Sequence, residues 1–550
     1  MSIPARRCAI LLRIGCGQLN SARKQAPSEL RDNDSFTRFP IQRRPQLSIP
    51  GAIAPTSLAQ DTDAKTPVAV IDIGSNSVRL VVYDAAKRAP VPVFNEKVLC
   101  GLGRGLDSTG RLNPEGVKLA HSSLHRFAAL TEAMGVTDIN AFATAAVREA
   151  GDGPDFTAAV ERDCGISVRI ISGEEEARLS ALGVLAEIPQ ARGFMGDLGG
   201  ASLEIAHLQG GKNLKQATLP IGPLRMACGP SDCSGGGMED HLALTTWLQS
   251  ARGETFYAVG GAWRSWARMH MRHVDYPLSI AHHYEISAAS ALEFAGKIAL
   301  LTPDALSGFV GLAEARTASI PFANILLKRL IEESAVSCVL FSAYGVREGS
   351  IFDRLPDFVK AQDPLIAACR NLAAMTGRAT ADGDALFRWM SPAFADETEG
   401  QARLRRAACL LADLEWSEHP DYRAEHALLR ILRYPLIGVD HPGRAYMALA
   451  VASRHAKVKE ELIARFLRDL LDRADLSRAR AAGLAMRLAY TFSGGVISLL
   501  EQTALRRDGN RLKLELPDHA DVLVGDVVQS RFRTLAQELG CQPRIATRAP

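Results

Sequence analysis

Two short stretches of the sequence combine an acidic residue with glycines and small polar residues. The first is Ile71-Asp-Ile-Gly-Ser-Asn-Ser77, and the second is Asp197-Leu-Gly-Gly-Ala-Ser202. Backbone N–H groups in such a turn favour an anion, usually a phosphate. A neighbouring carboxylate can hold the divalent cation that accompanies the phosphate. The residue types therefore indicate phosphate chemistry at a cation shared by Asp72 and Asp197.

A third stretch, Ser172-Gly-Glu-Glu-Glu-Ala-Arg178, is typical of a helix start. Ser172 followed three residues later by Glu175 predicts a capping box, and acids in a first turn suit the helix dipole. Neither argument explains Glu176, whose side chain points elsewhere around the helix. Glu176 is therefore the acid most available for acid–base chemistry, with Glu175 as the second candidate.

Other chemically capable residues have simpler interpretations. Glu204 alternates with apolar residues, so a solvated strand face is expected for it. Arg104 lies in a glycine-rich stretch that we interpret as a loop. Histidines cluster at 270–283, but no carboxylate or cysteine completes a metal-binding set in the sequence. We expect them to be packing or surface residues.

The apolar pattern predicts the elements that position these residues. Residues 68–73 and 78–83 are expected to form two strands joined by the first acidic turn. Further strands are expected at 139–143 and 168–171, and a helix at 172–187. Because the second acidic turn repeats the pattern of the first, we expect two related lobes that face each other across one cleft.

Length and composition set broad limits on the protein. A chain of 550 residues is too long for one core, and 47% hydrophobic with 23% charged residues is ordinary for a globular protein. The balance of 64 basic and 61 acidic residues gives a net charge of +3 and no overall attraction to nucleic acid. No apolar run is long enough to span a membrane. The ten cysteines are scattered, which favours reduced thiols and a cytoplasmic location.

Changes in pattern along the chain suggest five regions. Residues 1–66 are rich in Arg, Pro, Ser and Gln, and disorder is expected; a targeting segment and a natural start further along remain alternatives. Residues 67–190 and 191–358 form the two expected lobes. Residues 359–505 show helical spacing almost throughout, including a helix expected at 479–500. Residues 506–550 form a small α/β piece.

Taken with Arg347-Glu-Gly349, these motifs resemble the exopolyphosphatase and guanosine pentaphosphate phosphohydrolase family (Ppx/GppA). The resemblance implies an α/β fold of two ribonuclease-H-like lobes of the actin-like ATPase type, followed by an α-helical HD-like domain. It implies hydrolysis of a terminal phosphoryl group with Mg²⁺. It also implies a homodimer.

The resemblance assigns roles to individual residues. The family's catalytic Glu falls on Glu176, and an Arg that meets substrate phosphate falls on Arg148. The family's phosphate-loop residues fall on Asp72, Gly74, Ser75, Asn76, Asp197, Gly199, Gly200 and Ser202. We add Ser77 and Ala201 to the expected phosphate-binding residues, and we expect Asp72 and Asp197 to hold the metal. The sequence departs from the family in three places: Ala201 replaces a frequent Gly, Leu203 replaces a frequent Thr, and Ala412-Asp413 stands where the metal-binding His-Asp pair is expected. Without that His, no second metal site is expected.

Inorganic polyphosphate is the first choice of substrate, because the helical region carries many Arg residues that can guide a polyanion. Guanosine pentaphosphate is the alternative within the same chemistry. A kinase or ATPase of the same fold is a second possibility. A non-catalytic protein that binds polyphosphate or an alarmone is a third. Neither nucleic acid nor a membrane is expected as a partner.

Overall fold

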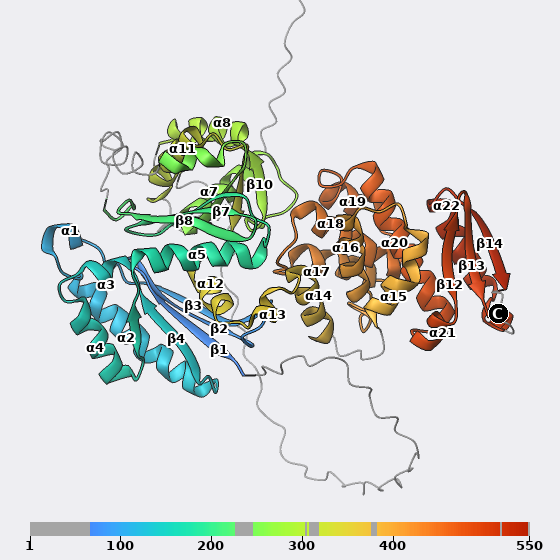
Figure 1. Ribbon diagram of the computed structural model, residues 1–550, viewed down its shortest axis with the longest axis horizontal. Helices are drawn as coiled ribbons and strands as arrows, with labels where there is room; N and C mark the ends of the chain where they lie inside the picture. The colour runs from blue at the N-terminus through green and yellow to red at the C-terminus, as the bar shows by residue number, and fades with distance from the viewer. Residues whose placement is uncertain are drawn as a thin grey trace, which may run out of the picture. The chain divides into compact units, whose positions relative to one another are not determined.

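The computed structural model describes residues 66–225, 246–302, 305–306, 318–375, 382–517 and 520–547. The predicted N-terminal extension, residues 1–66, lies outside these ranges apart from Thr66. Figure 1 shows two α/β lobes followed by a helical region and a small sheet. Within the described ranges, no helix is both long and apolar enough to cross a bilayer.

The first lobe contains a five-stranded sheet of order β3-β2-β1-β4-β5. Its first two strands are antiparallel and enclose the first acidic turn, as predicted, while β1 and β4 are parallel. The strands are β1 (Val68–Ile73), β2 (Ser77–Tyr83), β3 (Pro92–Leu99), β4 (Asp138–Ala143) and β5 (Val168–Ile170). The helices are α1 (Leu106–Thr109), α2 (Pro114–Ala133), α3 (Ala145–Glu149) and α4 (Gly153–Cys164).

The second lobe contains a six-stranded sheet of order β10-β11-β9-β6-β7-β8. Read from β8 to β11, it repeats the first sheet: two antiparallel pairs and then parallel neighbours. Its strands are β6 (Gly193–Leu198), β7 (Leu203–Gln209), β8 (Lys212–Leu219), β9 (Thr255–Gly260), β10 (Tyr284–Ser287) and β11 (Cys338–Ser342). Its helices are η1 (Thr246–Ala251), α7 (Gly261–His273), α8 (Ala288–Ala299) and α11 (Ile320–Ser334). The expected α/β fold with two related lobes is confirmed.

Helix α5 (Gly173–Glu187) runs between the two sheets, beside α12 (Val346–Asp353) (Figure 1). It is buried on nearly all sides, as expected of a helix with a sheet on each flank. The two helices cross in backbone contact. A Cβ on Gly349 would lie 1.8 Å from the carbonyl oxygen of Leu179, and one on Gly183 would lie 2.3 Å from that of Gly345. The glycines therefore permit this crossing.

Alternation along the strands decides which residues face α5. In β1, Ile71 and Ile73 pack in the core formed with α2 and α4, whereas Val68 and Val70 pack with α5 and α12. Asp72 follows the second set, because side chains two residues apart lie on the same face. Strand β1 thus directs its single acid, Asp72, toward the space around α5.

The side chains of the second sheet alternate in the same way. Phe194 and Leu203 pack in the core formed with α7 and α11, whereas Met195 and Ala206 pack with α5. By the same period of two, Asp197 on β6 and Glu204 on β7 face α5. The acids of both lobes therefore converge on the helix that carries Glu176.

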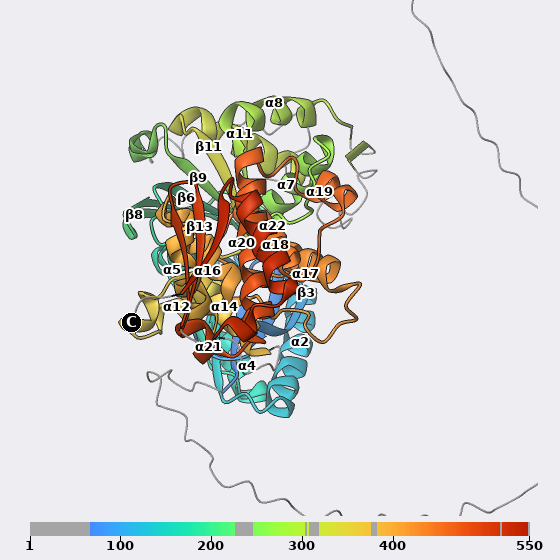
Figure 2. The same ribbon diagram turned by 90° about the vertical axis from the view of Figure 1, so that its right-hand side faces the viewer.

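The C-terminal region begins with helices that pack around α18 (Figure 2). Most residues of α18 are buried. The predicted helix at 479–500 ends earlier, at Ser493, because Gly494 takes a left-handed φ of 64° that caps it. Asp413, at the expected HD-like position, pairs with Arg454 at 2.8 Å. The helices are α13 (Asp357–Lys360), α14 (Pro364–Met375), α15 (Gly383–Met390), α16 (Glu399–Leu410), α17 (Arg423–Arg433), α18 (His441–His455), α19 (Glu460–Phe466), α20 (Arg473–Ser493) and α21 (Ile497–Glu501). The final α/β piece consists of β12 (Ala504–Asp508), β13 (Arg511–Leu516), α22 (Asp526–Glu538) and β14 (Gln542–Thr547).

Candidate active site

Four carboxylates line one cavity between the two lobes. Asp72 lies near the end of β1, Asp197 near the end of β6, Glu204 on β7 and Glu176 in the first turn of α5. The cavity has a volume of about 660 Å³. The sequence motifs predicted Asp72, Asp197 and Glu176 as site residues, and the structure adds Glu204.

The two acidic turns have the same construction. The N–H of Gly74 donates to the carbonyl of Ser77 at 3.0 Å, and the N–H of Gly199 donates to the carbonyl of Ser202 at 3.0 Å. These two N–H groups close their own turns, so neither is available to bind an anion. Each turn can offer an anion only the groups that follow its glycine.

The tips of the two turns meet across the cleft. A Cβ on Gly200 would lie 3.3 Å from Cβ of Asn76 and 3.4 Å from Cβ of Ser75. The hydroxyl of Ser75 accepts a hydrogen bond from the N–H of Ala146 at 3.2 Å, which fixes this tip on α3. The predicted phosphate-binding residues that line the cavity are Gly74, Ser75, Asn76, Ser77, Gly199, Gly200 and Ser202.

Ala201 is the predicted phosphate-binding residue that the structure places elsewhere. Its side chain is buried, and its carbonyl accepts a hydrogen bond from Nε of Arg225 at 2.7 Å. Ala201 thus stabilises the turn on the side away from the cavity and does not line the cavity.

Arg148 holds the carboxylate of Glu176. Its Nη1 donates to Oε2 of Glu176 at 3.0 Å and to the carbonyl of Ile171 at 3.1 Å. Burial raises the pKa of Glu176 to about 7, against the opposing effect of Arg148 and with further contributions from Asp72 and Asp197. A carboxyl group with this pKa can accept and release a proton near neutral pH.

Glu175, the second candidate, is directed away from the cavity. Its N–H donates to the hydroxyl of Ser172, but its carboxylate accepts from Arg178 at 2.8 Å. Arg178 also binds Asp353 on α12. Half of the predicted capping box is therefore formed, and Arg178 has taken the carboxylate that the other half requires.

The two predicted metal ligands already have partners in the protein. Arg347 on α12 donates to Oδ2 of Asp72 at 2.8 Å, and the hydroxyl of Ser180 on α5 donates to Oδ2 of Asp197 at 2.7 Å. Burial raises the pKa of Asp197, although Ser180, Arg264 and Arg347 act in the opposite direction. These bonds fix one oxygen of each carboxylate.

Glu204 was expected on a solvated strand face, and that expectation is wrong. Only 2% of the residue is exposed, and among the described residues its Oε1 has no hydrogen-bond partner. Burial, with Glu176 and Asp197 nearby, holds its pKa well above the usual range. The signal was present in the sequence: a four-residue turn after Asp197 and Leu198 pairs Asp197 with Glu204 in register.

The charges in the cavity suit an anion together with a cation. The buried acids raise one another's pKa, and a divalent cation among them would favour their ionised forms. Basic side chains from three parts of the chain also line the cavity: Arg79, Lys97, Arg104, Arg264 and Arg347. This combination is the one that a phosphate group and its cation require.

The histidine cluster at 270–283 divides into two environments. His270 is buried, with Nδ1 2.7 Å from the hydroxyl of Tyr284, so it is a packing residue as expected. His282 and His283 instead place Nε2 at 2.9 and 3.4 Å from Oε2 of Glu187. A carboxylate therefore does complete this set, contrary to the expectation.

The set is best explained as one buried carboxylate held by two imidazole rings. The N–H of Ala343 donates to Nδ1 of His282 at 3.1 Å, so the neutral ring carries its proton on Nε2, facing Glu187. Burial by itself would raise the pKa of Glu187, but the two imidazoles lower it to about 2. The ionised Glu187 thus anchors the end of α5 beside β10.

Comparisons with known proteins show two protein families that match the chain. Residues 80–358 match the Ppx/GppA phosphatase family, and residues 365–545 match the C-terminal exopolyphosphatase family. Exopolyphosphatase 1 of Mycobacterium tuberculosis is 32% identical over 160 residues, covering 28% of this chain and 46% of that protein. The chain thus spans about half the length of the curated exopolyphosphatases it matches.

Two further relatives differ in coverage. Retrograde regulation protein 2 of Saccharomyces cerevisiae is 25% identical over 456 residues, covering 72% of this chain and 75% of that protein. The crystal structure of an exopolyphosphatase from Cytophaga hutchinsonii is 22% identical, with a TM-score of 0.49, and covers 52% of this chain and 97% of its own. Because the first family match covers more than half of the sequence, the chain belongs to the Ppx/GppA phosphatase family.

Proposed function

We propose that the protein is an exopolyphosphatase, which removes the terminal phosphoryl group of inorganic polyphosphate by attack of water. The observation that carries the proposal is the position of Glu176, a buried carboxylate of raised pKa between two acidic turns. Family membership and the exopolyphosphatases among the relatives support the same chemistry.

Asp72, Asp197 and Glu204 are suited to hold Mg²⁺. Oε1 of Glu204, which has no hydrogen-bond partner among the described residues, is a buried oxygen of the kind that this cation prefers. When bound, the cation supplies neutralisation of the charge that develops on the phosphoryl oxygens. Asp72 and Asp197 each have one oxygen in a bond to Arg347 or Ser180, and both residues line the cavity.

Glu176 acts as the general base in this proposal. Arg148 occupies Oε2, which leaves Oε1 to accept a proton from water. The water oxygen then forms a bond to the terminal phosphorus, and the anhydride P–O bond breaks. The leaving oxygen stays with the shortened chain, and the released phosphate carries the oxygen from water.

The basic residues favour a long polyanion over a compact nucleotide. Arg79, Arg264 and Arg347 line the active cavity and also a second cavity of about 330 Å³ next to it. Arg433 and Arg444 of the helical region line that second cavity. Positive charge therefore continues beyond the site of cleavage, where further phosphates of a polymer would lie.

Two alternatives remain. Guanosine pentaphosphate is a second substrate with the same terminal anhydride. A binding protein without catalysis is the alternative of another class, and the yeast relative, which is named a regulation protein, is the observation that favours it.

Phosphate release tests these alternatives directly. The full chain is incubated with long-chain polyphosphate or with guanosine pentaphosphate, each with Mg²⁺ and with EDTA. Faster release from the polymer, abolished by EDTA and by Glu176→Gln, is expected. Faster release from the nucleotide would select the alternative substrate, and tight binding of either without release would select the binding protein.

A further inference from the structure

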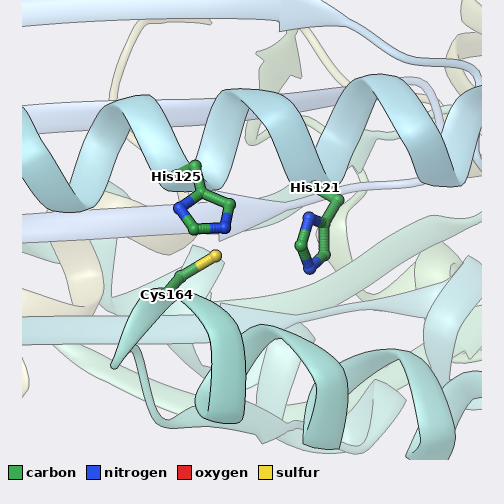
Figure 3. Close-up of side chains that lie close together, drawn as sticks. All are labelled: His121, His125 and Cys164. Atoms are coloured by element: carbon green, nitrogen blue, oxygen red, sulfur yellow. The ribbon is translucent and has the colours of Figure 1, made fainter.

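Two histidines and a cysteine lie together on the outer side of the first lobe. His121 and His125 are on α2, and Cys164 is the last residue of α4. Figure 3 shows the two imidazole rings and the thiol directed into one space between these helices. One nitrogen of each ring and the Sγ atom all lie within 4.8 Å of one another.

The spacing on α2 is that of a chelating pair. Residues four apart share one face of a helix, and the rings of His121 and His125 are 5.2 Å apart between centroids. Cys164 approaches from the second helix, which packs against the first. The cluster therefore joins two elements that are separate in sequence.

Asp163 orients one of the rings. Nε2 of His121 lies 3.1 Å from Oδ2 of Asp163. When Nε2 donates its proton to this carboxylate, Nδ1 keeps its lone pair for a ligand. A carboxylate on the second nitrogen is the usual support for a metal-binding histidine.

Cys164 has the properties of a ligand and not of a structural disulfide. It is a free thiol and is half-buried. A bound cation would displace the proton, since the thiolate is the form that coordinates metals.

We propose that His121, His125 and Cys164 form a binding site for Zn²⁺ or a similar transition-metal ion, with water as the fourth ligand. Two imidazole nitrogens and one thiolate suit these ions, whereas Mg²⁺ prefers oxygen. The site is distinct from the proposed active site. Helices α2 and α4 cover the face of the first sheet opposite to α5, and the acids Asp72 and Glu176 lie on the α5 side.

The bound ion would fasten α2 to α4. The chain continues from α4 through β5 (Val168–Ile170) into α5, which carries Glu176. Metal binding would therefore stabilise the lobe that positions this helix, without adding a ligand to the cavity itself.

Titration with Co²⁺ tests the site in the full chain after treatment with a chelator. Thiolate coordination to Co²⁺ gives a charge-transfer band that oxygen ligands in the active cavity do not give. We expect one equivalent of Co²⁺ to produce this band and Zn²⁺ to remove it. Cys164→Ser should abolish the band, whereas Cys338→Ser, a half-buried thiol beside Thr255 in the second lobe, should keep it.

Two substitutions at exposed positions test the site without changing the protein core. His125 is exposed, so His125→Gln removes a ligand without disturbing a core. Asp163→Asn removes the carboxylate that contacts Nε2 of His121 and should weaken Zn²⁺ binding by roughly tenfold to a hundredfold. The proposal is overturned if wild-type protein gives no band, or if the band persists in both Cys164→Ser and His125→Gln.

Discussion

Asp197 on β6 lies directly opposite Glu204 on β7 in the strand register, and both side chains face α5. The corresponding pair in the first lobe is Asp72 and Arg79. One construction, a strand, a four-residue turn and a returning strand, thus gives two acids in one lobe and an acid with a base in the other. This difference contributes to the mixed charge of the cleft, together with the other basic residues that line it.

Glu176→Gln is expected to reduce turnover by roughly a hundredfold or more, because the amide cannot accept the proton of the attacking water. Substrate affinity should change little, since Gln can still accept the hydrogen bond from Arg148. Initial rates of phosphate release and equilibrium binding measure the two effects. Glu175→Gln is the matched control, because this neighbouring carboxylate binds Arg178 outside the cavity. Comparable losses in both variants would contradict the assignment.

The stability of the metal-free protein should fall as pH rises through about 7, the pKa to which burial raises Glu176 from its usual 4.5. The folded state binds this proton more tightly than the unfolded state, so the contribution is complete below the unfolded pKa and is lost above the folded one. The loss is roughly 1–3 kcal/mol. Urea unfolding midpoints at pH 5 and pH 8 in EDTA measure it. Glu176→Gln should show a smaller difference between the two pH values than the wild type.

Glu204→Gln is expected to raise the Mg²⁺ concentration needed for half-maximal activity by tenfold or more. The buried carboxylate of Glu204 has an oxygen without a partner among the described residues, and the amide would supply a weaker ligand there. A Mg²⁺ titration of phosphate release tests this expectation. Glu174→Gln serves as the control, because Glu174 is exposed on α5. An unchanged Mg²⁺ requirement in Glu204→Gln would exclude this residue from the cation site.

Arg347→Ala should destabilise the protein by about 3 kcal/mol, because the largely buried carboxylate of Asp72 would lose its ion-pair partner. Arg354→Ala is the comparison: Arg354 lies at the end of the same helix, and its ion pair with Asp138 is half-exposed. An exposed pair contributes about 1 kcal/mol or less. Denaturant unfolding of both variants measures the difference. Equal effects would mean that the bond between Arg347 and Asp72 does not couple the lobes.

Gly349→Ala should disrupt the crossing of α5 and α12, since the new Cβ would lie 1.8 Å from the carbonyl oxygen of Leu179. The helices would have to separate, which moves Glu176 relative to the turns. We expect loss of both stability and activity. Gly296→Ala in α8 is the control, because nothing lies within 4 Å of a Cβ there and alanine favours a helix by about 0.5–1 kcal/mol. Thermal unfolding and phosphate release compare the two variants.

The local features of the site could be predicted from the sequence. The two acidic turns, the cap at Ser172 and the distinction between Glu175 and Glu176 depend on residues that are neighbours along the chain. Their hydrogen bonds form within a few residues, so spacing alone predicts them. The α/β pattern was also predictable, because the hydrophobic period reports each element separately.

The tertiary structure decided which of these residues meet. No pattern within one segment shows that Arg347 would bind Asp72, that Arg148 would hold Glu176, or that Glu187 would join His282 and His283. Burial of Glu204 depends on α5 covering the second sheet, and the pKa of Glu176 depends on acids from both lobes. Desolvation and charge interactions act through space, and the chain brings their sources together only when both sheets close on one helix.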